Sequence, residues 1–317
     1  MKVLITGAAG FIGSNLAIKC LSLGWQVHCV DDLSNGHLEF LPRSFDDLSC
    51  DDFASDDSLR AITKNQYDVV FHLAAVPRVS YSVEHPVESN DANVTKTLKL
   101  MNACRSNVGK FVFASSSSVY GSGSKIPTFE SHTKRPSSPY ALQKSIIEDY
   151  LRIYHELYDL PSVCLRFFNV FGNHALGTSS YATALAAWLT SIKQERPMRS
   201  DGDGSQSRDL CHVDNVVHAC LKAVNSTVTN AECYNVACGK STTNKGLLSY
   251  LLARYPNASI IDSPWRLGDV KHTLADIQKS KDELGYEPIV DVWDGVERTC
   301  DWYDRNWHWV KGLKQGI

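Results

Sequence analysis

Tyr140 and Lys144 stand four residues apart in the stretch SPYALQK, residues 138–144. On a helix, positions i and i+4 share one face, so the ammonium group of Lys144 can lie near the phenol of Tyr140. Free tyrosine has a pKa near ~10, and a neighbouring cation lowers that pKa by favouring the phenolate. The pair could therefore provide a general base near neutral pH. The alternative is two unrelated polar residues on a helix, because a Tyr-x-x-x-Lys match is common by chance.

A glycine-rich turn near the start of the chain, TGAAGFIG at residues 6–13, has the composition of a diphosphate-binding loop. Glycines let the backbone turn tightly and approach a pyrophosphate, and the following helix N-terminus supplies free N–H groups. Asp31 ends the next expected strand, where a carboxylate accepts hydrogen bonds from an adenosine ribose and favours NAD over NADP. The alternative is a purely structural turn. The expected cofactor contacts in the loop are Gly7, Gly10, Phe11, Ile12 and Gly13.

The elements that must position these residues alternate between short β-branched runs and helical patterns. Alternation of this kind predicts an α/β fold, a doubly wound parallel sheet of Rossmann type with helices on both faces. The longest helix should begin at Ser138-Pro139, because serine is a good N-cap and proline fits the first turn. We expect strands at 3–5, 26–30, 68–73, 110–114 and 162–168, and helices at 14–23, 90–107 and 139–158.

The pattern changes after about residue 172, where Gly, Ser, Asp and Asn become dense and the segments less regular. We therefore expect a Rossmann-type cofactor domain at 1–171 and a smaller, mixed α/β substrate lobe at 172–317. Part of 216–236 is expected to return to the main sheet.

Composition and charge exclude several classes of protein. The 317 residues carry a formal net charge of −3 and no basic run, which argues against binding to nucleic acid or to a membrane surface. No apolar run approaches the ~18 residues of a membrane span, so we expect a cytoplasmic protein. The ten cysteines are scattered without a Cys-x-x-Cys motif and should be reduced core residues. Cys211 and His212 with Asp214 lack a second well-spaced pair, so no metal site is expected.

Five motifs occur in order along the chain: GAAGFIG (7–13), HLAA (72–75), SSSSVYG (115–121), YALQK (140–144) and RFFNVFG (166–172). No single motif is decisive, but the ordered set resembles the extended short-chain dehydrogenases/reductases, specifically the NAD-dependent nucleotide-sugar epimerases. The resemblance covers essentially the whole chain. The sequences of residues 202–217 and 268–276 are most similar to those of the bacterial UDP-N-acetylglucosamine 4-epimerases.

This resemblance implies a reaction and three catalytic residues. Tyr140, assisted by Lys144, would take the proton from the 4-hydroxyl of a UDP-sugar while carbon 4 gives hydride to NAD. Ser116, four residues before the tyrosine of VYG, would hold that hydroxyl. The 4-keto sugar would turn over, and hydride would return to its other face. The implied substrates are UDP-GlcNAc and UDP-GalNAc, with UDP-Glc and UDP-Gal as a second pair.

The resemblance also implies contacts with the two ligands. Asp52, Ala74 and Asn93 would join Tyr140 and Lys144 around NAD; the residues alone leave Asp51 open as an alternative to Asp52. The implied substrate contacts are Arg78, Ser116, Ser117, Asn169, Arg208, Arg266, Asp269 and Thr273.

Several alternatives remain at this level. A 4,6-dehydratase usually has Asp-Glu before VYG, where this chain has Ser117 and Ser118, which cannot do that acid–base work. Thr273 stands where epimerases of unsubstituted hexoses often have tyrosine, and Pro77 where they have lysine. A UDP-glucuronate 4-epimerase stays open because Arg78 could pair with a carboxylate. A non-catalytic NAD-binding protein is an alternative from a different functional class.

A homodimer through the helices at 90–107 and 139–158 is expected by resemblance.

Overall fold

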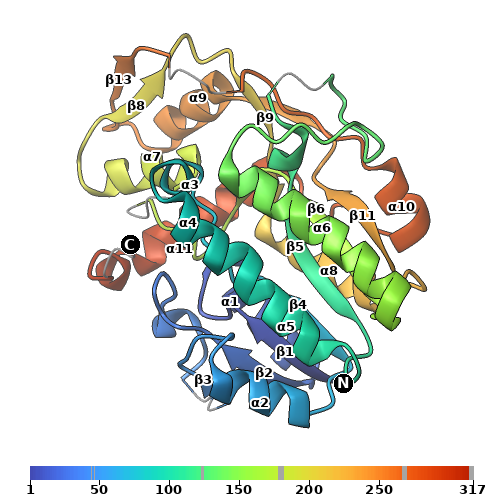
Figure 1. Cartoon of the computed structure of the whole chain (residues 1–317). Helices are drawn as coiled ribbons and strands as arrows, with labels where there is room; N and C mark the ends of the chain where they lie inside the picture. Colours follow the sequence, from blue (N-terminus) through green and yellow to red (C-terminus); the bar gives the residue numbers. More distant parts are fainter. Residues whose placement is uncertain (44, 46, 123–124, 178–181, 266–269, 314–317) are drawn as a thin grey trace.

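The computed structural model describes residues 1–317 except 44, 46, 123–124, 178–181, 266–269 and 314–317. Its centre is a seven-stranded sheet in the order β3-β2-β1-β4-β5-β6-β11, in which every neighbouring pair is parallel (Figure 1). The strands are β1 Lys2–Thr6, β2 Gln26–Val30, β3 Leu48–Ser49, β4 Val69–His72, β5 Phe111–Ser116, β6 Ser162–Phe167 and β11 Asn230–Val236.

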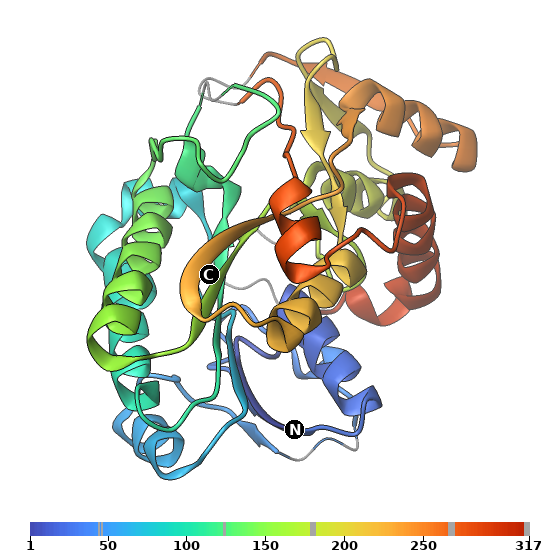
Figure 2. The same ribbon diagram turned by 90° about the vertical axis from the view of Figure 1, so that its right-hand side faces the viewer.

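Helices cover both faces of this sheet, as Figure 2 shows from the side. One apolar core joins the sheet to α1 (Phe11–Ser22), α8 (Val213–Asn225) and α10 (Gln278–Leu284). The other core joins it to α2 (Asp56–Lys64), α5 (Lys96–Cys104) and α6 (Pro139–Tyr158). The central strands are buried on both sides, which is the reason they read as continuous apolar runs rather than alternating ones.

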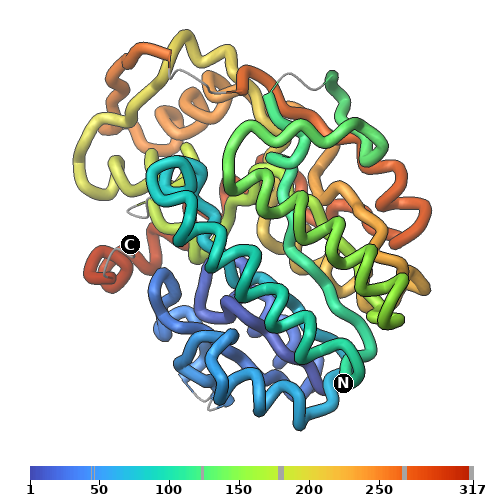
Figure 3. The backbone as a smooth tube through the Cα atoms, viewed as in Figure 1, coloured from blue at the N-terminus to red at the C-terminus, as the bar shows by residue number. Residues whose placement is uncertain are grey.

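The helix expected at 90–107 is the end of a longer rod. It starts with α4 (Pro86–Asn90), continues through a π-helical turn, η2 (Asp91–Thr95), and ends with α5. Figure 3 traces the three as one continuous helix. The short helix α3 (Val79–Glu84) precedes the rod, and both α3 and α4 pack against α6.

The remaining elements build a smaller lobe beside the carboxyl ends of the strands (Figure 1). Its strands pair in three small sheets, β7 with β10, β8 with β13 and β9 with β12. Its strands are β7 Val170–Phe171, β8 Met198–Asp201, β9 Ser207–Asp209, β10 Cys211–His212, β12 Ser241–Thr243 and β13 Ile260–Ser263. Its helices are α7 Ala184–Lys193, α9 Asn244–Arg254 and α11 Val292–Val310.

The predicted fold class is confirmed: a doubly wound parallel sheet with a mixed C-terminal lobe. The expected return of 216–236 consists of α8, which packs on the sheet, and β11, which pairs with β6 at its edge. The domain boundary near residue 171 stays a prediction. All ten cysteines are free, and seven of them are buried. No helix in the described part of the chain is long and apolar enough to cross a membrane.

Candidate active site

A cavity of about 780 Å³ lies where the carboxyl ends of the parallel strands meet the smaller lobe. Residues from the glycine-rich loop, from the ends of β2, β4 and β5, from α6 and from the lobe line it together. The residues of the sequence prediction that line it are Gly7, Gly10, Phe11, Ile12, Gly13, Asp31, Asp52, Ala74, Ser116, Ser117, Tyr140, Lys144, Asn169, Arg208 and Thr273.

The glycine-rich loop forms a cradle that side chains would fill. Gly7 has φ +70°, and a Cβ there would lie 2.7 Å from the backbone nitrogen of Ala74. A Cβ on Gly13 would lie 2.0 Å from the carbonyl oxygen of Gly7. Gly10 is the N-cap of α1, whose first turn carries no acidic side chain. The loop therefore fits a diphosphate, which backbone N–H groups and the positive helix end would bind.

Asp31 lies at the end of β2 beside this loop and is buried. One carboxylate oxygen accepts the Ala9 N–H at 2.9 Å and the other accepts the Leu33 N–H at 2.8 Å. Burial raises the pKa of Asp31 above its ordinary value, although both hydrogen bonds oppose the shift. Each oxygen keeps a lone pair, so the carboxylate can still accept from the two hydroxyls of a ribose.

The structure separates the two neighbouring aspartates that the sequence left as alternatives. Asp52 lines the cavity and forms an ion pair with Lys96 at 2.6 Å. Asp51 accepts hydrogen bonds from the hydroxyls of Ser55 and Ser58, at the start of α2. Of the two, Asp52 lines the cavity, although it also accepts the Ala54 N–H, and Asp51 contacts the start of the helix. The contact of Asp52 with the cofactor stays a prediction.

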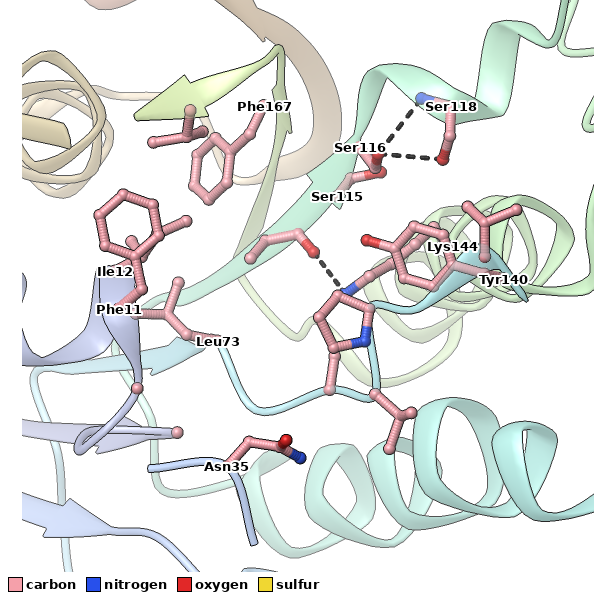
Figure 4. Close-up of a pocket in the computed structure, with 18 of the residues that line it drawn as sticks. Phe11, Ile12, Asn35, Leu73, Ser115, Ser116, Ser118, Tyr140, Lys144 and Phe167 are labelled. Carbon is pink, nitrogen blue, oxygen red and sulfur yellow. Dashed lines mark hydrogen bonds between the residues drawn. The ribbon is translucent and has the colours of Figure 1, made fainter. Parts of the chain in front are cut away.

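Tyr140 and Lys144 lie together in the first turns of α6, which begins as expected: the Ser138 hydroxyl caps the Ala141 N–H at 3.2 Å. Both side chains line the cavity, and Figure 4 shows the Tyr140 hydroxyl pointing into it. The Lys144 ammonium is 5.9 Å from the centre of the Tyr140 ring and donates to the carbonyl of Ala114 at 2.8 Å. Burial lowers the pKa of Lys144 to about 7.

Three serines of the run, Ser115, Ser116 and Ser118, differ in what they contact. The Ser115 hydroxyl donates into the core, to Glu148 at 2.6 Å. Ser116 faces the cavity at the end of β5 and caps the short helix η3 (Ser117–Tyr120). Its Oγ accepts from the Ser118 N–H at 3.2 Å and from the Ser118 hydroxyl at 2.9 Å (Figure 4).

On the lobe side, Asn169 and Thr273 are hydrogen-bonded to each other. The Asn169 amide donates to the Thr273 hydroxyl at 2.9 Å and to the Asp209 carbonyl at 3.2 Å. The Arg208 guanidinium donates to the Lys271 carbonyl at 3.1 Å and lines the cavity. These residues bring one amide and one fixed positive charge to the side opposite the glycine-rich loop.

Comparison with known proteins identifies the family. Residues 3–237 match the NAD dependent epimerase/dehydratase family. The chain belongs to this family. It is 31% identical to the structure of the UDP-glucose 4-epimerase of Thermotoga maritima with UDP-glucose, which covers 97% of this chain and all of that one with a TM-score of 0.91.

Two further relatives are about as similar. The structure of a UDP-N-acetylglucosamine 4-epimerase from Methanobrevibacter ruminantium, in complex with UDP-N-acetylmuramic acid, is 34% identical with a TM-score of 0.90, over 96% of this chain and 98% of that one. A UDP-glucuronate 4-epimerase of Thermodesulfobacterium geofontis is 30% identical over 331 residues, 98% of each chain. Epimerases named for three different sugars are therefore between 30% and 34% identical to this chain.

NAD is the cofactor of this protein, as it is in the family and in related structures that contain bound NAD. The cradle at Gly7 and Gly13 and the carboxylate of Asp31 fit its diphosphate and its adenosine ribose. Among the described residues, no group of three or more His, Cys, Asp or Glu side chains could hold a metal ion.

Two predicted contacts do not reach the cavity. Arg78 stands between Pro77 and Val79, which do line it, and serves as the N-cap residue of α3. Asn93 is buried in the π-helical turn, where its side chain bonds both the N–H and the carbonyl of Val76. Asn93 therefore holds the cavity-lining segment after β4 in place, and its contact with the cofactor stays a prediction. Arg266 and Asp269 lie outside the described residues.

The structure adds a buried ion pair that the motifs did not reveal. Glu148 accepts two hydrogen bonds from Arg166, both at 2.8 Å, besides the one from Ser115. Burial alone would raise the pKa of Glu148, but the contacts with Arg166 outweigh it and leave the pKa below its ordinary value. The spacing of Tyr140, Lys144 and Glu148, four residues each, was the available signal, since it places all three on one face of α6.

Asp209 is a second addition, fully buried below the lobe wall. Its carboxylate accepts the backbone N–H groups of Cys238, Gly239 and Ala275 at 2.9 to 3.0 Å. Burial raises the pKa of Asp209 to about 6. It stands directly after Arg208, and it ties together the three segments that form this side of the cavity.

Proposed function

We propose that this protein is a UDP-sugar 4-epimerase that interconverts UDP-GlcNAc and UDP-GalNAc, with UDP-Glc and UDP-Gal as a weaker pair. One observation carries the proposal: Ser116, Tyr140 and Lys144 line the same cavity as the glycine-rich cradle. Tyrosine, lysine and serine at the carboxyl edge of a dinucleotide-binding sheet can assist the oxidation and re-reduction of an alcohol by a bound dinucleotide, since they supply a base, a charge and a hydrogen-bond donor.

Each of the three side chains has a separate task. NAD, when bound, supplies the oxidation of carbon 4 and its reversal. Tyr140 takes the proton from the sugar's 4-hydroxyl and later returns one to oxygen 4. The positive charge of Lys144 favours the phenolate of Tyr140. Ser116 holds oxygen 4 by donating its own proton.

The lobe side of the cavity suits the uridine diphosphate. Arg208 carries a planar guanidinium, which binds phosphate oxygens in a fork. Asn169 adds an amide within the same wall. A substrate held at its diphosphate leaves the hexose free to turn, and this freedom is what inversion at carbon 4 requires.

The choice of sugar rests on a few positions. Thr273 is small, and its hydroxyl already accepts hydrogen bonds from Asn169 and from the backbone of Asp209. That leaves room for a 2-acetamido group, where a tyrosine would not. Arg78 is not among the residues that line the cavity, which supports ranking the glucuronate carboxylate behind the 2-acetamido group. UDP-glucuronate therefore stands second.

We also propose that the protein is a homodimer. Along α6, Leu142, Tyr150, Ile153 and Leu157 are all exposed. Their spacing places them on one stripe of the helix. Val87, on the adjoining α4, is 76% exposed. An apolar stripe across two packed helices of each subunit would be buried by pairing two copies into a four-helix bundle.

The test of the activity is incubation of the purified protein with UDP-GlcNAc, without added NAD, and detection of UDP-GalNAc by proton NMR. UDP-Glc and UDP-glucuronate run in parallel. UDP-GalNAc is the expected main product. Conversion of UDP-glucuronate alone would overturn the choice of sugar, and no conversion of any of the three, with NAD supplied, would overturn the epimerase.

Tyr140→Phe separates an enzyme from a non-catalytic NAD-binding protein. This variant keeps the ring that packs in the site but loses the group that moves the proton. We expect turnover to fall by about 10³-fold while UDP-sugar binding, measured by calorimetry, stays within about threefold. Equal turnover by Tyr140→Phe and wild type would exclude Tyr140 as the base.

A further inference from the structure

Ser118 reaches back to Ser116, two residues before it, with two hydrogen bonds. The Oγ of Ser116 accepts from the Ser118 N–H at 3.2 Å and from the Ser118 hydroxyl at 2.9 Å (Figure 4). A serine hydroxyl has two lone pairs and one proton. Both lone pairs of Ser116 therefore accept hydrogen bonds from Ser118, and Ser116 can interact with a ligand only by donating its own proton.

The surrounding structure holds this arrangement in place. Ser115 is fixed by its hydrogen bond to Glu148. Ser116 caps η3, and the last two residues of η3, Val119 and Tyr120, are buried. The Tyr120 hydroxyl donates to Asn235 at 2.6 Å. Since both ends of the serine run are anchored, Ser118 is held against Ser116 before any substrate arrives.

We propose that Ser118 is a positioning residue, which makes Ser116 a hydrogen-bond donor only. This inference rests on the proposed 4-epimerase. Oxygen 4 of the sugar begins as a hydroxyl that gives its proton to Tyr140, and it becomes a carbonyl oxygen. A fixed donor binds that oxygen more strongly as negative charge develops on it. Ser118 should therefore affect the rate more than the binding of the UDP-sugar.

Without the Ser118 hydroxyl, Ser116 can turn its proton towards other acceptors, and part of the population offers a lone pair to oxygen 4. Two other roles for Ser118 give different results. It also lines the cavity, so it could contact the sugar itself. It could equally serve only the stability of η3.

The first experiment is a double-mutant cycle with the UDP-sugar that the wild type converts. Removing a complete oxyanion donor costs about 10²–10³-fold in kcat. Ser118→Ala removes only the group that restrains such a donor, Ser116, so we expect kcat to fall by about tenfold while KM stays within about twofold of the wild type. Ser118→Thr keeps a hydroxyl and should stay within about threefold of the wild type. In the Ser116→Ala background, Ser118→Ala should change kcat by less than about twofold, because its effect passes through Ser116.

Additive losses in the cycle would overturn the proposal in favour of direct contact with the sugar. An unchanged kcat in Ser118→Ala would also overturn it. Ser118→Ala and Ser118→Thr could also lose thermal stability and kcat to the same extent. That result would assign Ser118 to the stability of η3 alone and would likewise overturn the proposal.

A binding experiment tests the same idea without turnover. In the Tyr140→Phe background, calorimetry compares UDP-4-keto-6-deoxyglucose, a carbonyl probe, with UDP-glucose. Adding Ser118→Ala should weaken the carbonyl probe by about tenfold and UDP-glucose by less than about twofold. Equal losses for the two ligands, or no loss, would overturn the role of Ser118. A wild type that epimerises no UDP-sugar would overturn the proposed function, and this binding comparison would still decide the inference.

Discussion

The two sides of the cavity are built by different interactions. On the sheet side, β1, β4 and β6 are buried nearly throughout, and apolar packing on both faces holds their ends in place. On the lobe side, short strand pairs are joined by buried polar contacts, centred on Asp209 and on the Asn169–Thr273 pair. Apolar packing is spread over many residues, whereas a buried polar contact fails once one partner is left unsatisfied.

This structural difference corresponds to a difference in function between the two sides of the cavity. The sheet side presents the cradle, Tyr140 and Lys144 at fixed places, as the oxidation of one carbon atom requires. The lobe side presents Arg208 and Asn169 on segments held by a few hydrogen bonds. Variants on the sheet side should therefore change the chemistry and the cofactor content, and variants on the lobe side should change substrate affinity, whereas stability can change on either side.

The largest effect is expected for Gly13→Ala on the sheet side. The new Cβ would lie 2.0 Å from the Gly7 carbonyl oxygen, which is backbone and cannot turn away. We expect most bound NAD to be lost and the free energy of unfolding to fall by about 3 kcal/mol. The measurements are the NAD content of the purified protein and urea unfolding.

Gly24→Asn is the control for that variant. Gly24, unlike the helical Gly13, has a positive φ of +73°, but nothing lies within 4 Å of a Cβ there, and asparagine tolerates this conformation. Its stability should change by less than about 1 kcal/mol. Wild-type NAD content and stability in Gly13→Ala would contradict a cradle that depends on close backbone packing.

Lys144→Met should reduce kcat by about 10³-fold and yet stabilise the fold by about 1–2 kcal/mol at pH 7. Burial lowers the pKa of Lys144 to about 7, from an ordinary value of 10.5. Between these two pH values the unfolded chain binds a proton that the folded protein does not, so this residue makes stability rise with pH. The gain from Lys144→Met should therefore be larger at pH 7 than at pH 10.

Lys110→Met provides the matched control, because Lys110 is also buried. Its ammonium donates to the carbonyls of Ala223 and Ser226 at the end of α8. Removal of that group should cost about 1–2 kcal/mol, since two carbonyls lose their donor. Urea unfolding at both pH values measures the two variants. A loss of stability in Lys144→Met at pH 7 would show that its charge is well compensated in the folded protein.

The same contrast explains which parts of the molecule the sequence predicts. The cradle and the Tyr140–Lys144 face depend on a strand, a turn and one helix, so their geometry is encoded over a few residues. The strand–helix alternation likewise predicts the parallel sheet, which the structure confirms. The contacts of Asn93 could not be predicted from its spacing, because the π-helical turn places its side chain against the backbone of Val76.

The parts that the sequence did not predict depend on contacts between distant residues. Glu148 meets Ser115, 33 positions earlier, and Arg166, 18 positions later. Asp209 meets Ala275, 66 positions away. Periodicity carries no information about such pairs, because irregular segments lie between them. The place of Arg78 is of the same kind: it is the N-cap residue of α3 and is not among the residues that line the cavity.

Asp209→Ala tests the lobe side. Three backbone N–H groups would lose their acceptor in a site that water does not reach, and we expect a loss of about 3 kcal/mol in the free energy of unfolding. Asp203→Ala is the control, because the exposed Asp203 accepts from the N–H and the hydroxyl of Ser205 within its own turn, and its loss should cost less than about 0.5 kcal/mol. Similar losses in the two variants, measured by urea unfolding, would contradict a lobe held by buried polar contacts.

Thr273→Val should have the smallest effect and the most specific one. The valine keeps the shape of threonine but removes the oxygen that accepts from the Asn169 amide at 2.9 Å and from the Asp209 N–H at 3.1 Å. We expect a loss of about 1 kcal/mol in stability. The KM for the UDP-sugar should rise by about threefold while kcat stays constant, because the proposed contact of Asn169 with the substrate would be made in the ground and transition states alike. Thr273→Ser keeps the oxygen and should match the wild type. If Thr273→Val instead lowered kcat with an unchanged KM, the lobe side would take part in the chemistry, and the division between the two sides of the cavity would be wrong.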